Sequence, residues 1–358
     1  MIHVVILAGG SGTRFWPKSR GSLPKQFLSF GGREPLLVET AERMRLVAPP
    51  ERTWVVTAEA HVKRVRKLLP ELPPEQVVGE PAARDTAPAV ALAALRVARR
   101  EPDATLLVCP ADHRIEPAAR LAAAVRAAEE LVARDPRRIV VFGVAPTEPA
   151  TGYGYVEFGA PLGTFQSLAA HDVKAFHEKP DAARAQAYVA GGRHWWNAGI
   201  ACMRATALRE EIALQMPALA AGLAELEKCT EERRFAAELA RLFPTFEKRS
   251  LDHGVLERAR ARGVIRLDLS WDDVGSFPAL ARTRAPDAQG NVVLGDAIAL
   301  DSSRNIVDAG DGLVALIGVD DVIVVHTGDV TLVCRRDRAE EIKRAIEQAR
   351  ARKLDRFL

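Results

Sequence analysis

The sequence has few cysteines, and none of them stand close together. They are Cys109, Cys202, Cys229 and Cys334 in a chain of 358 residues, and no CxxC pair occurs. Disulfide frameworks and structural zinc sites need cysteines at closer and more regular spacing. We therefore expect four separate thiols in a reducing compartment.

Long apolar runs and a strong net charge are also missing. No stretch approaches the ~18 apolar residues of a membrane-spanning helix. The apolar run at residues 3–8 has no basic segment before it and no cleavage site after it, which indicates a first strand rather than a signal peptide. The formal net charge is only +3, with basic residues spread along the chain. Nucleic acid and membranes are therefore not expected partners, and a cytoplasmic location is expected.

What the sequence does contain is an alternation of short apolar runs with longer helical patterns. Its length suggests two domains at roughly 150 residues each, with one large α/β unit as the competing interpretation. The runs are apolar on both faces, and their order with helices between them predicts an α/β fold with a doubly wound, mainly parallel sheet. The predicted strands are residues 4–7, 53–57, 105–109 and 139–143, and the predicted helices are 36–47, 87–100 and 118–134.

The pattern changes twice along the chain. Strands mix with helices after about Thr151, and short strands broken by Gly, Asp and Ser follow after about Ala285. We predict a first domain at residues 1–285 and a small C-terminal β-rich domain at 286–358 that ends in a helix at 338–352. Its predicted strands, which form no strict repeat, are residues 292–294, 297–300, 314–317, 322–326 and 331–334.

The first predicted strand runs directly into a glycine-rich loop. Gly9, Gly10 and Gly12 let the backbone approach a ligand and turn N–H groups toward an anion, and Arg14 and Lys25 add positive charge. The loop lacks GxxxxGK[ST], and a phenylalanine replaces the last glycine of GxGxxG, so neither common phosphate motif applies. A tight strand-to-helix turn is the structural alternative. We interpret the loop as a phosphate cradle.

Two acidic turns suggest a metal site. Asp112 follows the predicted strand at 105–109 directly, and Asp273 lies in the run WDDVG. Mg²⁺ takes a few carboxylates together with substrate phosphate oxygens, so one aspartate from each turn suffices. Taken singly, each aspartate is more often a helix cap or a turn former. His113, beside Asp112, is interpreted as structural.

Several segments together resemble the sugar-1-phosphate nucleotidyltransferases, and most closely their mannose-1-phosphate guanylyltransferase (GDP-mannose pyrophosphorylase) branch. The opening signature is long and specific, and the other segments follow in the family's order. They are LAGGSGTRFWPKSRGSLPKQF, GEPAARDTAPAVALAAL, CPADHRI, TGYGYVEFG, FHEKPD, WWNAGIACM, SLDHGVLE and WDDVGSF. The resemblance extends to about Ser276 and continues more weakly to the end.

The resemblance implies a Rossmann-like nucleotidyltransferase domain, a short β-helix-like C-terminal domain, and a set of site residues. Arg14, Lys25, Asp112 and Asp273 would be catalytic, with the two aspartates holding Mg²⁺. The nucleotide GTP would contact Gly9, Gly10, Gly12, Thr13, Glu80, Arg84 and Thr86. Mannose 1-phosphate would contact Gly152, Glu178, Lys179, Asn197 and Asp252.

Several of these residues also have structural interpretations. Gly152 could be a turn glycine, Glu178 and Lys179 an exposed charged pair, and Asn197 a satisfied amide at the end of a strand. The nearby tryptophans are interpreted as packing: Trp195, Trp196 and Trp271. The chain departs from the family pattern at His253, where tyrosine is frequent, and at Phe277, where tryptophan is frequent.

The implied activity is the reaction of GTP with mannose 1-phosphate, giving GDP-mannose and pyrophosphate. The resemblance also implies a homodimer, and no isomerase activity, because the long extension of bifunctional relatives is missing. Three alternatives stay open. They are another sugar 1-phosphate such as glucose 1-phosphate with UTP, dTTP or ATP, a non-catalytic nucleotide-sensing homologue, and a Rossmann-type oxidoreductase, which the missing third glycine disfavours.

Overall fold

The computed structural model describes residues 1–10, 12–30 and 34–358 and divides into two units that are not consecutive in sequence. Unit 1 consists of Met1–Gly9, Thr40–Ala111 and Ile115–Trp271. Unit 2 consists of Gly10–Glu39, Asp112–Arg114 and Asp272–Leu358. The second unit therefore takes in the loop after the first strand as well as the C-terminal part of the chain.

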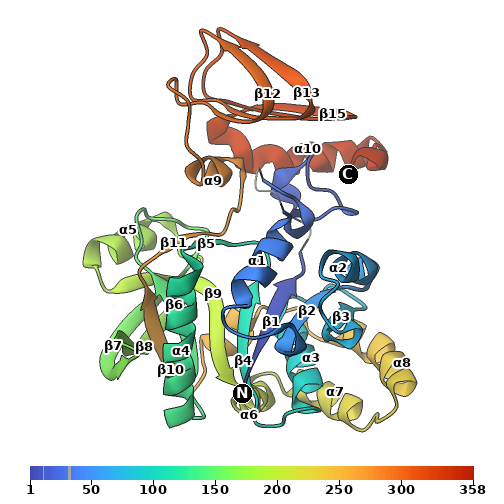
Figure 1. Ribbon diagram of the computed structural model, residues 1–358, viewed down its shortest axis with the longest axis vertical. Coiled ribbons are helices and arrows are strands. Elements are labelled where there is room, and N and C mark those ends of the chain that lie inside the picture. Colours follow the sequence, from blue (N-terminus) through green and yellow to red (C-terminus); the bar gives the residue numbers. More distant parts are fainter. Residues whose placement is uncertain (11, 31–33) are drawn as a thin grey trace. The chain divides into compact units, whose positions relative to one another are not determined.

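Unit 1 is built on a nine-stranded mixed sheet (Figure 1). The strand order is β3-β2-β1-β4-β9-β6-β10-β8-β7, and β7 also pairs with β9. Pairing is parallel among β1 to β4 and between β6 and β10, whereas β7, β8 and β9 pair antiparallel with their neighbours. The bounds are β1 Ile2–Ala8, β2 Thr53–Ala58, β3 Val77–Glu80, β4 Thr105–Pro110, β6 Ile139–Val144, β7 Gly154–Phe165, β8 Leu168–Glu178, β9 His194–Arg204 and β10 Arg262–Leu267.

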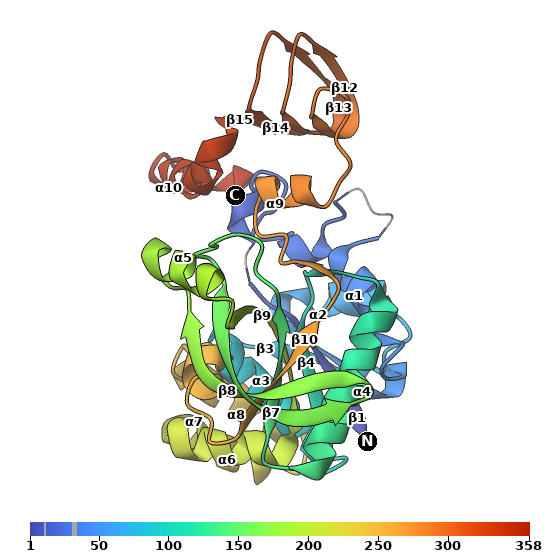
Figure 2. The same ribbon diagram turned by 90° about the vertical axis from the view of Figure 1, so that its left-hand side faces the viewer.

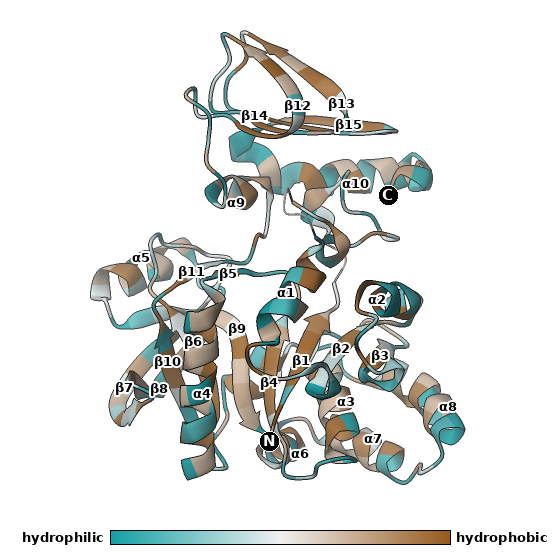
Figure 3. Cartoon of the chain, in the orientation of Figure 1, coloured by the Kyte–Doolittle hydropathy of each residue, from teal (hydrophilic) through white to brown (hydrophobic). Residues whose placement is uncertain are grey.

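Helices cover this sheet because its central strands are apolar on both faces. β1 and β4 are mostly brown in Figure 3, and nearly all of their side chains are buried. Among the helices, α3 packs on β1 and β2, while α4 packs on β6, β9 and β10. The bounds are α1 Leu36–Met44, α2 Val62–Leu68, α3 Thr86–Ala98, α4 Ala118–Arg134, α5 Ala182–Gly191, α6 Ala205–Gln215, α7 Pro217–Glu227 and α8 Glu232–Leu242.

The predicted α/β class is confirmed, and so are the four predicted strands and three predicted helices of the first half. The helix predicted at 118–134 has those bounds, whereas the one predicted at 36–47 ends at Met44. The antiparallel pairing of the long strands β7, β8 and β9 was not predicted. Local periodicity does not encode which strands pair with each other.

In unit 2 the C-terminal part forms a second sheet, ordered β12-β13-β14-β15. Pairing is parallel from β12 to β14, and β15 closes an antiparallel hairpin with β14. The predicted β-rich domain is thereby confirmed. The bounds are β12 Val292–Leu300, β13 Ile306–Ile317, β14 Val322–Thr327 and β15 Val330–Arg335, with helices α9 Phe277–Arg282 and α10 Ile342–Ala351.

Two details of this sheet differ from the prediction. The strands predicted at 292–294 and 297–300 form one strand, β12, whose register shifts where Gly295 adopts a φ of 84°. The strand predicted at 314–317 begins at Ile306, because Asp308 and the glycines after it lie in β13 rather than in a turn. The predicted final helix begins as a 3₁₀ segment, Arg336–Glu341, before α10.

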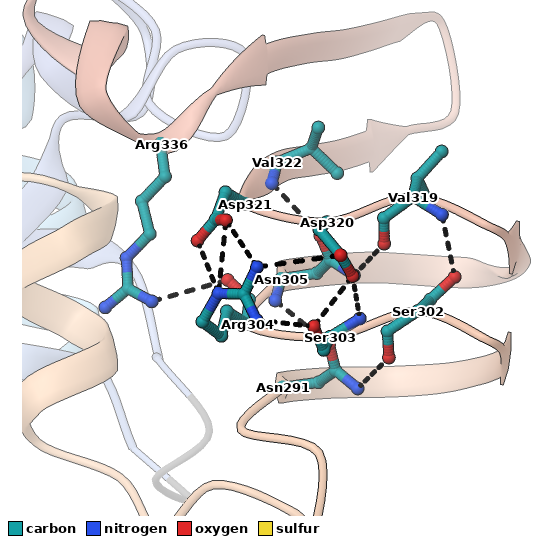
Figure 4. Close-up of polar contacts among 10 residues, drawn as sticks. All are labelled: Asn291, Ser302, Ser303, Arg304, Asn305, Val319, Asp320, Asp321, Val322 and Arg336. Atoms are coloured by element: carbon teal, nitrogen blue, oxygen red, sulfur yellow. Dashed lines mark hydrogen bonds and ion pairs between the residues drawn. The ribbon is translucent and has the colours of Figure 1, made fainter.

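Buried polar side chains connect the successive turns of the parallel strands (Figure 4). The Asn305 amide donates to the Val319 carbonyl at 2.9 Å and accepts from the Val322 N–H at 3.0 Å. Asn291 accepts from the Asn305 N–H at 2.9 Å and donates to the Ser302 carbonyl at 3.0 Å. These side chains satisfy backbone groups that the turns would otherwise bury without partners.

Candidate active site

In unit 2, one lysine joins the two acidic turns that the sequence singled out. Lys25 is buried, and its Nζ donates to Asp112 Oδ2 at 2.8 Å and to the Asp273 backbone carbonyl at 2.6 Å. Asp112 follows β4 directly, and Asp273 follows the short strand β11, Ser270–Asp272. Two aspartates far apart in sequence therefore meet at one ammonium group.

The Asp112 carboxyl remains ionised at this position. Burial acts to raise the pKa of the Asp112 carboxyl, but the positive charges of Lys25 and His113 outweigh it, and the net pKa is lowered. The Asp112 side chain is 30% exposed, so it is not closed off from solvent. An anion held next to a buried cation and partly exposed to solvent can still accept a metal ion.

Two glycines allow this close arrangement. Gly12 has a φ of +55°, and a Cβ built on it would lie 2.6 Å from the Lys25 Cβ. A Cβ on Gly275 would lie 2.8 Å from Asp273 Oδ2 and 3.2 Å from an Nη of Arg14. Gly275 is therefore flanked by the Asp273 carboxylate and the exposed Arg14 guanidinium, and any larger residue at either glycine would displace charged groups.

The segment after Arg14 is held by side-chain contacts within unit 2 that the sequence analysis missed. Phe15 is fully buried, with its ring 4.6 Å from Phe30 and 4.9 Å from Phe277 between centroids. The Trp16 indole donates to the Phe357 carbonyl at 2.7 Å. Lys18 forms an ion pair with the buried Asp308 carboxylate.

Arg20 adds a second anchor, because its guanidinium pairs with Asp329 and donates to the Thr327 hydroxyl at 3.2 Å. The only sequence signal for these contacts was a run of basic and aromatic residues after Arg14. Their partners lie far away in sequence, so the sequence alone did not identify them. The loop is thus built on the C-terminal strands of its own unit.

The predicted nucleotide residues of unit 1 lie around the ends of β1 and β3. A Cβ on Gly9 would lie 3.7 Å from the Glu80 carboxylate. Burial, followed by the negative charge of Asp85, raises the pKa of Glu80 to about 7. Gly10 belongs to unit 2 and has a φ of +91°, and Ser11 lies outside the described residues.

Arg84 and Thr86 make contacts with a later segment of unit 1. The Arg84 guanidinium donates to the Pro244 carbonyl, and the Thr86 hydroxyl accepts from the Leu251 N–H at 2.8 Å. Asp85, at a φ of 67°, caps α3 by accepting from the Thr86 N–H at 2.8 Å. Both predicted side chains therefore have partners within the protein, which gives them structural roles whether or not they also contact a nucleotide.

Four of the residues predicted to contact the sugar phosphate converge in unit 1. Asn197 on β9 donates to Asp252 Oδ1 at 3.0 Å, and Glu178 at the end of β8 forms an ion pair with Lys179. A Cβ on Gly154 would lie 2.6 Å from Glu178 Oε2 and 3.5 Å from the Asn197 Cβ, so that glycine gives these two side chains their room. Burial and then the charge of Glu178 raise the pKa of Asp252 to about 6.

Gly152 is exposed, with no atom of the described residues within 4 Å of where its Cβ would stand. Next to it in sequence, Tyr153 contacts two of the tryptophans interpreted as packing. Its ring lies 5.0 Å from both Trp196 and Trp271 in edge-to-face geometry. The third, Trp195, stacks on Phe158 at 4.3 Å. Aromatic packing therefore surrounds the end of β9 that carries Asn197.

Two family models match the chain. The model described as nucleotidyl transferase matches residues 3–290, and the one described as MannoseP isomerase/GMP-like beta-helix domain matches residues 295–349. No helix among the described residues is both long and apolar enough to cross a membrane.

Known proteins resemble the chain over nearly its whole length. The xanthan biosynthesis protein XanB of Xanthomonas campestris pv. campestris (strain B100) is 39% identical over 97% of this chain and 73% of its own. A Klebsiella pneumoniae protein named mannose-1-phosphate guanylyltransferase is 37% identical over 97% and 74%. A crystal structure from Thermus thermophilus, named as a mannose-1-phosphate geranyltransferase, is 32% identical, with a TM-score of 0.88 over 98% of this chain and 99% of that one.

Proposed function

The chain belongs to the nucleotidyl transferase family, and on that premise we propose that it transfers a guanylyl group from GTP to mannose 1-phosphate. The products are GDP-mannose and pyrophosphate. Relatives that carry the guanylyltransferase name support the choice of substrates, since they are 37% identical over 97% of this chain. The structural observation that carries the proposal is the buried Lys25 ammonium shared by Asp112 and the Asp273 turn.

The reaction is a substitution at phosphorus. A phosphate oxygen of mannose 1-phosphate forms a bond to the α-phosphorus of GTP, and the bond from that phosphorus to the oxygen leading to the β-phosphate breaks. The nucleophile is already an anion at neutral pH, so no general base is required. The barrier is electrostatic, because two polyanions must meet and charge must move onto pyrophosphate. Positive charge held in advance is what the protein has to supply.

Lys25 and Arg14 supply that charge in the proposed mechanism. Lys25 is fixed by burial and by its two oxygen partners, so its ammonium needs little reorganisation when a phosphate approaches. Arg14 is exposed, and its guanidinium offers a planar fork of donors to phosphate oxygens. Gly12 lets the chain pass close to Lys25, because a Cβ there would lie 2.6 Å from the Lys25 Cβ.

The donors of the two acidic turns fit Mg²⁺, because the Asp112 carboxylate and the Asp273 backbone carbonyl, both oxygen donors, already meet at one cation, the Lys25 ammonium. We assign Asp112 and Asp273 as the residues that would hold the ion. When bound, Mg²⁺ would supply charge neutralisation on the reacting phosphates. Asp112 is kept ionised by Lys25 and His113, so it is ready to accept a cation without first losing a proton.

The sugar phosphate is assigned to unit 1. Lys179 offers an ammonium for the phosphate, since its side chain is 64% exposed despite the ion pair with Glu178. Sugar hydroxyls would find acceptors on Glu178 and Asp252 and an amide donor on Asn197. We also propose that the Gly152 backbone lies close to the sugar phosphate. The nucleotide is assigned to Gly9, Gly10, Gly12, Thr13, Glu80, Arg84 and Thr86.

A substrate panel tests the proposal. Pyrophosphate release is measured with mannose 1-phosphate or glucose 1-phosphate against GTP, UTP, dTTP and ATP, each with and without Mg²⁺. We expect the GTP and mannose 1-phosphate pair to have the highest kcat/KM and to need Mg²⁺. A higher kcat/KM with another pair would replace the assigned substrates. Tight binding of a sugar nucleotide with no turnover in any pair would indicate a nucleotide sensor instead.

We also propose a homodimer in the cytoplasm. Apolar side chains on the C-terminal sheet support the dimer, because Ile298, Leu300, Leu313 and Ile317 are all exposed. Exposed apolar groups gathered on one sheet favour a protein interface. The mass in solution, measured by light scattering for the native chain and for the double variant Leu313→Ser, Ile317→Ser, tests this, and a native monomer would reject it.

A further inference from the structure

Three side chains that the proposed reaction does not use gather on the β7, β8 and β9 part of the unit 1 sheet. They are Glu157 on β7, His177 on β8 and His194 on β9. One possible ligand atom from each lies within 4.8 Å of the others, and all three residues are half-buried. Two imidazoles and a carboxylate at this spacing are a typical ligand set for a transition metal.

The strand register explains why they meet. Glu157 is directly opposite His194, and His177 is opposite Tyr155, which precedes Glu157 by two residues on the same face of β7. Glu178 is paired with Gly154 and therefore points to the other face, together with Asn197. The three-residue cluster and the residues assigned to mannose 1-phosphate thus occupy opposite faces of the same strands.

Helix α5 holds the two imidazoles in place. α5 follows β8 after a short turn and packs on β9 (Figure 2). Its Tyr188 ring stacks on His194 at 4.1 Å with an interplanar angle of 20°, and on His177 at 5.0 Å and 24°. A ring packed on both imidazoles restricts their rotation, so the ligand geometry is largely set before an ion arrives.

One buried nitrogen in this cluster has no partner among the described residues. His194 Nδ1 is inaccessible to solvent and forms no hydrogen bond there. An unsatisfied buried polar atom costs roughly 1–3 kcal/mol, so its presence calls for an explanation.

The structure assigns Glu157, His177 and His194 as a binding site for a divalent transition metal ion of the zinc class. Nitrogen ligands favour zinc, cobalt and nickel ions over Mg²⁺, which prefers oxygen alone. Ligand atoms around tetrahedral zinc stand roughly 3.4 Å apart, so atoms that lie within 4.8 Å of one another need to approach by at most about 1.4 Å. Water completes the coordination, as in zinc sites with three protein ligands.

Lys174 is the group that competes with the ion. Its ammonium lies 2.7 Å from Glu157 Oε1, and its side chain is 64% exposed. A carboxylate has two oxygens, so one can coordinate while the other keeps this ion pair, and a mobile lysine can also move into solvent. The bound ion would connect three strands and fix the end of β8, where Glu178 is the last residue and Lys179 follows it.

Metal titration of the untagged, chelator-treated chain tests the assignment. Zn²⁺ binding is followed by calorimetry, and Co²⁺ binding by visible absorption, which reports nitrogen ligation and a tetrahedral geometry. We expect one equivalent bound in the native chain and in the control His326→Gln, which lies in unit 2. His177→Gln and His194→Gln should each weaken binding by at least the ~10–100-fold that loss of an outer-sphere partner costs.

Melting curves recorded in chelator separate loss of ligand from loss of fold, since a folded apo variant melts near the native temperature. Glu157→Gln provides a third variant of nearly equal volume. We expect millimolar Mg²⁺ to leave zinc binding unchanged and the Asp112→Asn variant to retain it. Both results support a site separate from the proposed catalytic metal. The assignment is overturned if native chain and the double variant His177→Gln, His194→Gln bind alike, or if Asp112→Asn is the change that removes binding.

Discussion

Lys25 combines three properties at the scale of a single residue: it is buried, charged and bonded to groups from two separate turns. We expect Lys25→Met to lower kcat by roughly 10²–10³, the usual cost of removing one fixed charge that stabilises a transition state. Asp112→Asn should cause a loss of similar size. Pyrophosphate release at saturating substrate measures both.

The matched control is Lys228→Met, which removes a lysine of a surface ion pair with Glu225. Such pairs contribute little, so this variant should keep the native kcat. Circular dichroism and melting temperature establish that Lys25→Met is folded. A folded Lys25→Met enzyme with native kcat would remove the lysine from the mechanism.

Glu80 gives the protein a predicted pH dependence of stability. Its pKa is raised from 4.5 to about 7, so the folded chain holds a proton there that the unfolded chain has already lost. The sign follows from linkage: the free energy of unfolding falls as pH rises from about 4.5 to about 7. Glu80→Gln removes this loss, so the variant should exceed the native chain in stability at pH 8 and match it near pH 4.

The size of the effect is bounded by the shift. Each pKa unit corresponds to about 1.4 kcal/mol, and partial exposure of Glu80 reduces the total to about 2 kcal/mol. Urea unfolding at several pH values measures the difference in unfolding free energy between Glu80→Gln and the native chain. Other titrating groups, such as Asp252, contribute equally to both proteins and cancel in this difference. A constant difference from pH 4 to pH 8 would show that Glu80 does not titrate in this range.

At the scale of elements, the loop after Arg14 depends on the C-terminal strand β13 through Lys18 and Asp308. Asp308 is buried and Lys18 largely so, and removal of one member leaves the other charge without its partner. We expect Lys18→Met to lower the free energy of unfolding by about 3 kcal/mol, near the low end of values for broken buried ion pairs. Equilibrium unfolding in urea measures this.

A double-mutant cycle isolates the pair. The combined variant Lys18→Met, Asp308→Asn should lose less stability than the sum of the single changes, because no charge remains buried alone. Arg338→Met, from an exposed pair with Glu341, serves as the control and should change stability by less than about 1 kcal/mol. Strict additivity of the two single changes would show that the pair does not couple the loop to β13.

Elements with local signals were predictable, and long-range partners were not. Periodicity sufficed for β1, β2, β4, β6 and α4, and the glycines together with Arg14, Lys25 and the two aspartates indicated the unit 2 cluster before its geometry was known. The start of β13 was missed because Asp308, a residue typical of turns, is paired with Lys18 from the other end of the chain. The Glu157, His177 and His194 cluster was missed for a similar reason, since only the register of three strands brings it together.

At the scale of the whole molecule, unit 1 and unit 2 each contain a hydrophobic core among the described residues. One large cluster of the unit 1 core has members from Val5 to Val264. The core of unit 2 combines Phe15, Phe30 and Phe277 with apolar residues of the C-terminal strands and α10, such as Ile323 and Ile346. The domain boundary predicted near Ala285 would pass through this second core, because its members stand on both sides of that residue.

A chain that ends at Ala285 is therefore expected to lose activity although it keeps every proposed catalytic residue. Without β12 to β15 and α10, Phe15 and Phe30 lose their packing partners, and Lys18 and Arg20 lose Asp308 and Asp329. Each large apolar side chain left exposed forfeits roughly 1.5–3 kcal/mol, which is enough to unfold the segment that carries Arg14 and Lys25. Limited proteolysis should cleave the truncated chain within residues 12–30 and leave residues 40–111 and 115–271 resistant, whereas residues 12–30 of the full chain should resist. Native kcat in the truncated chain would show instead that the loop holds its geometry without the C-terminal strands.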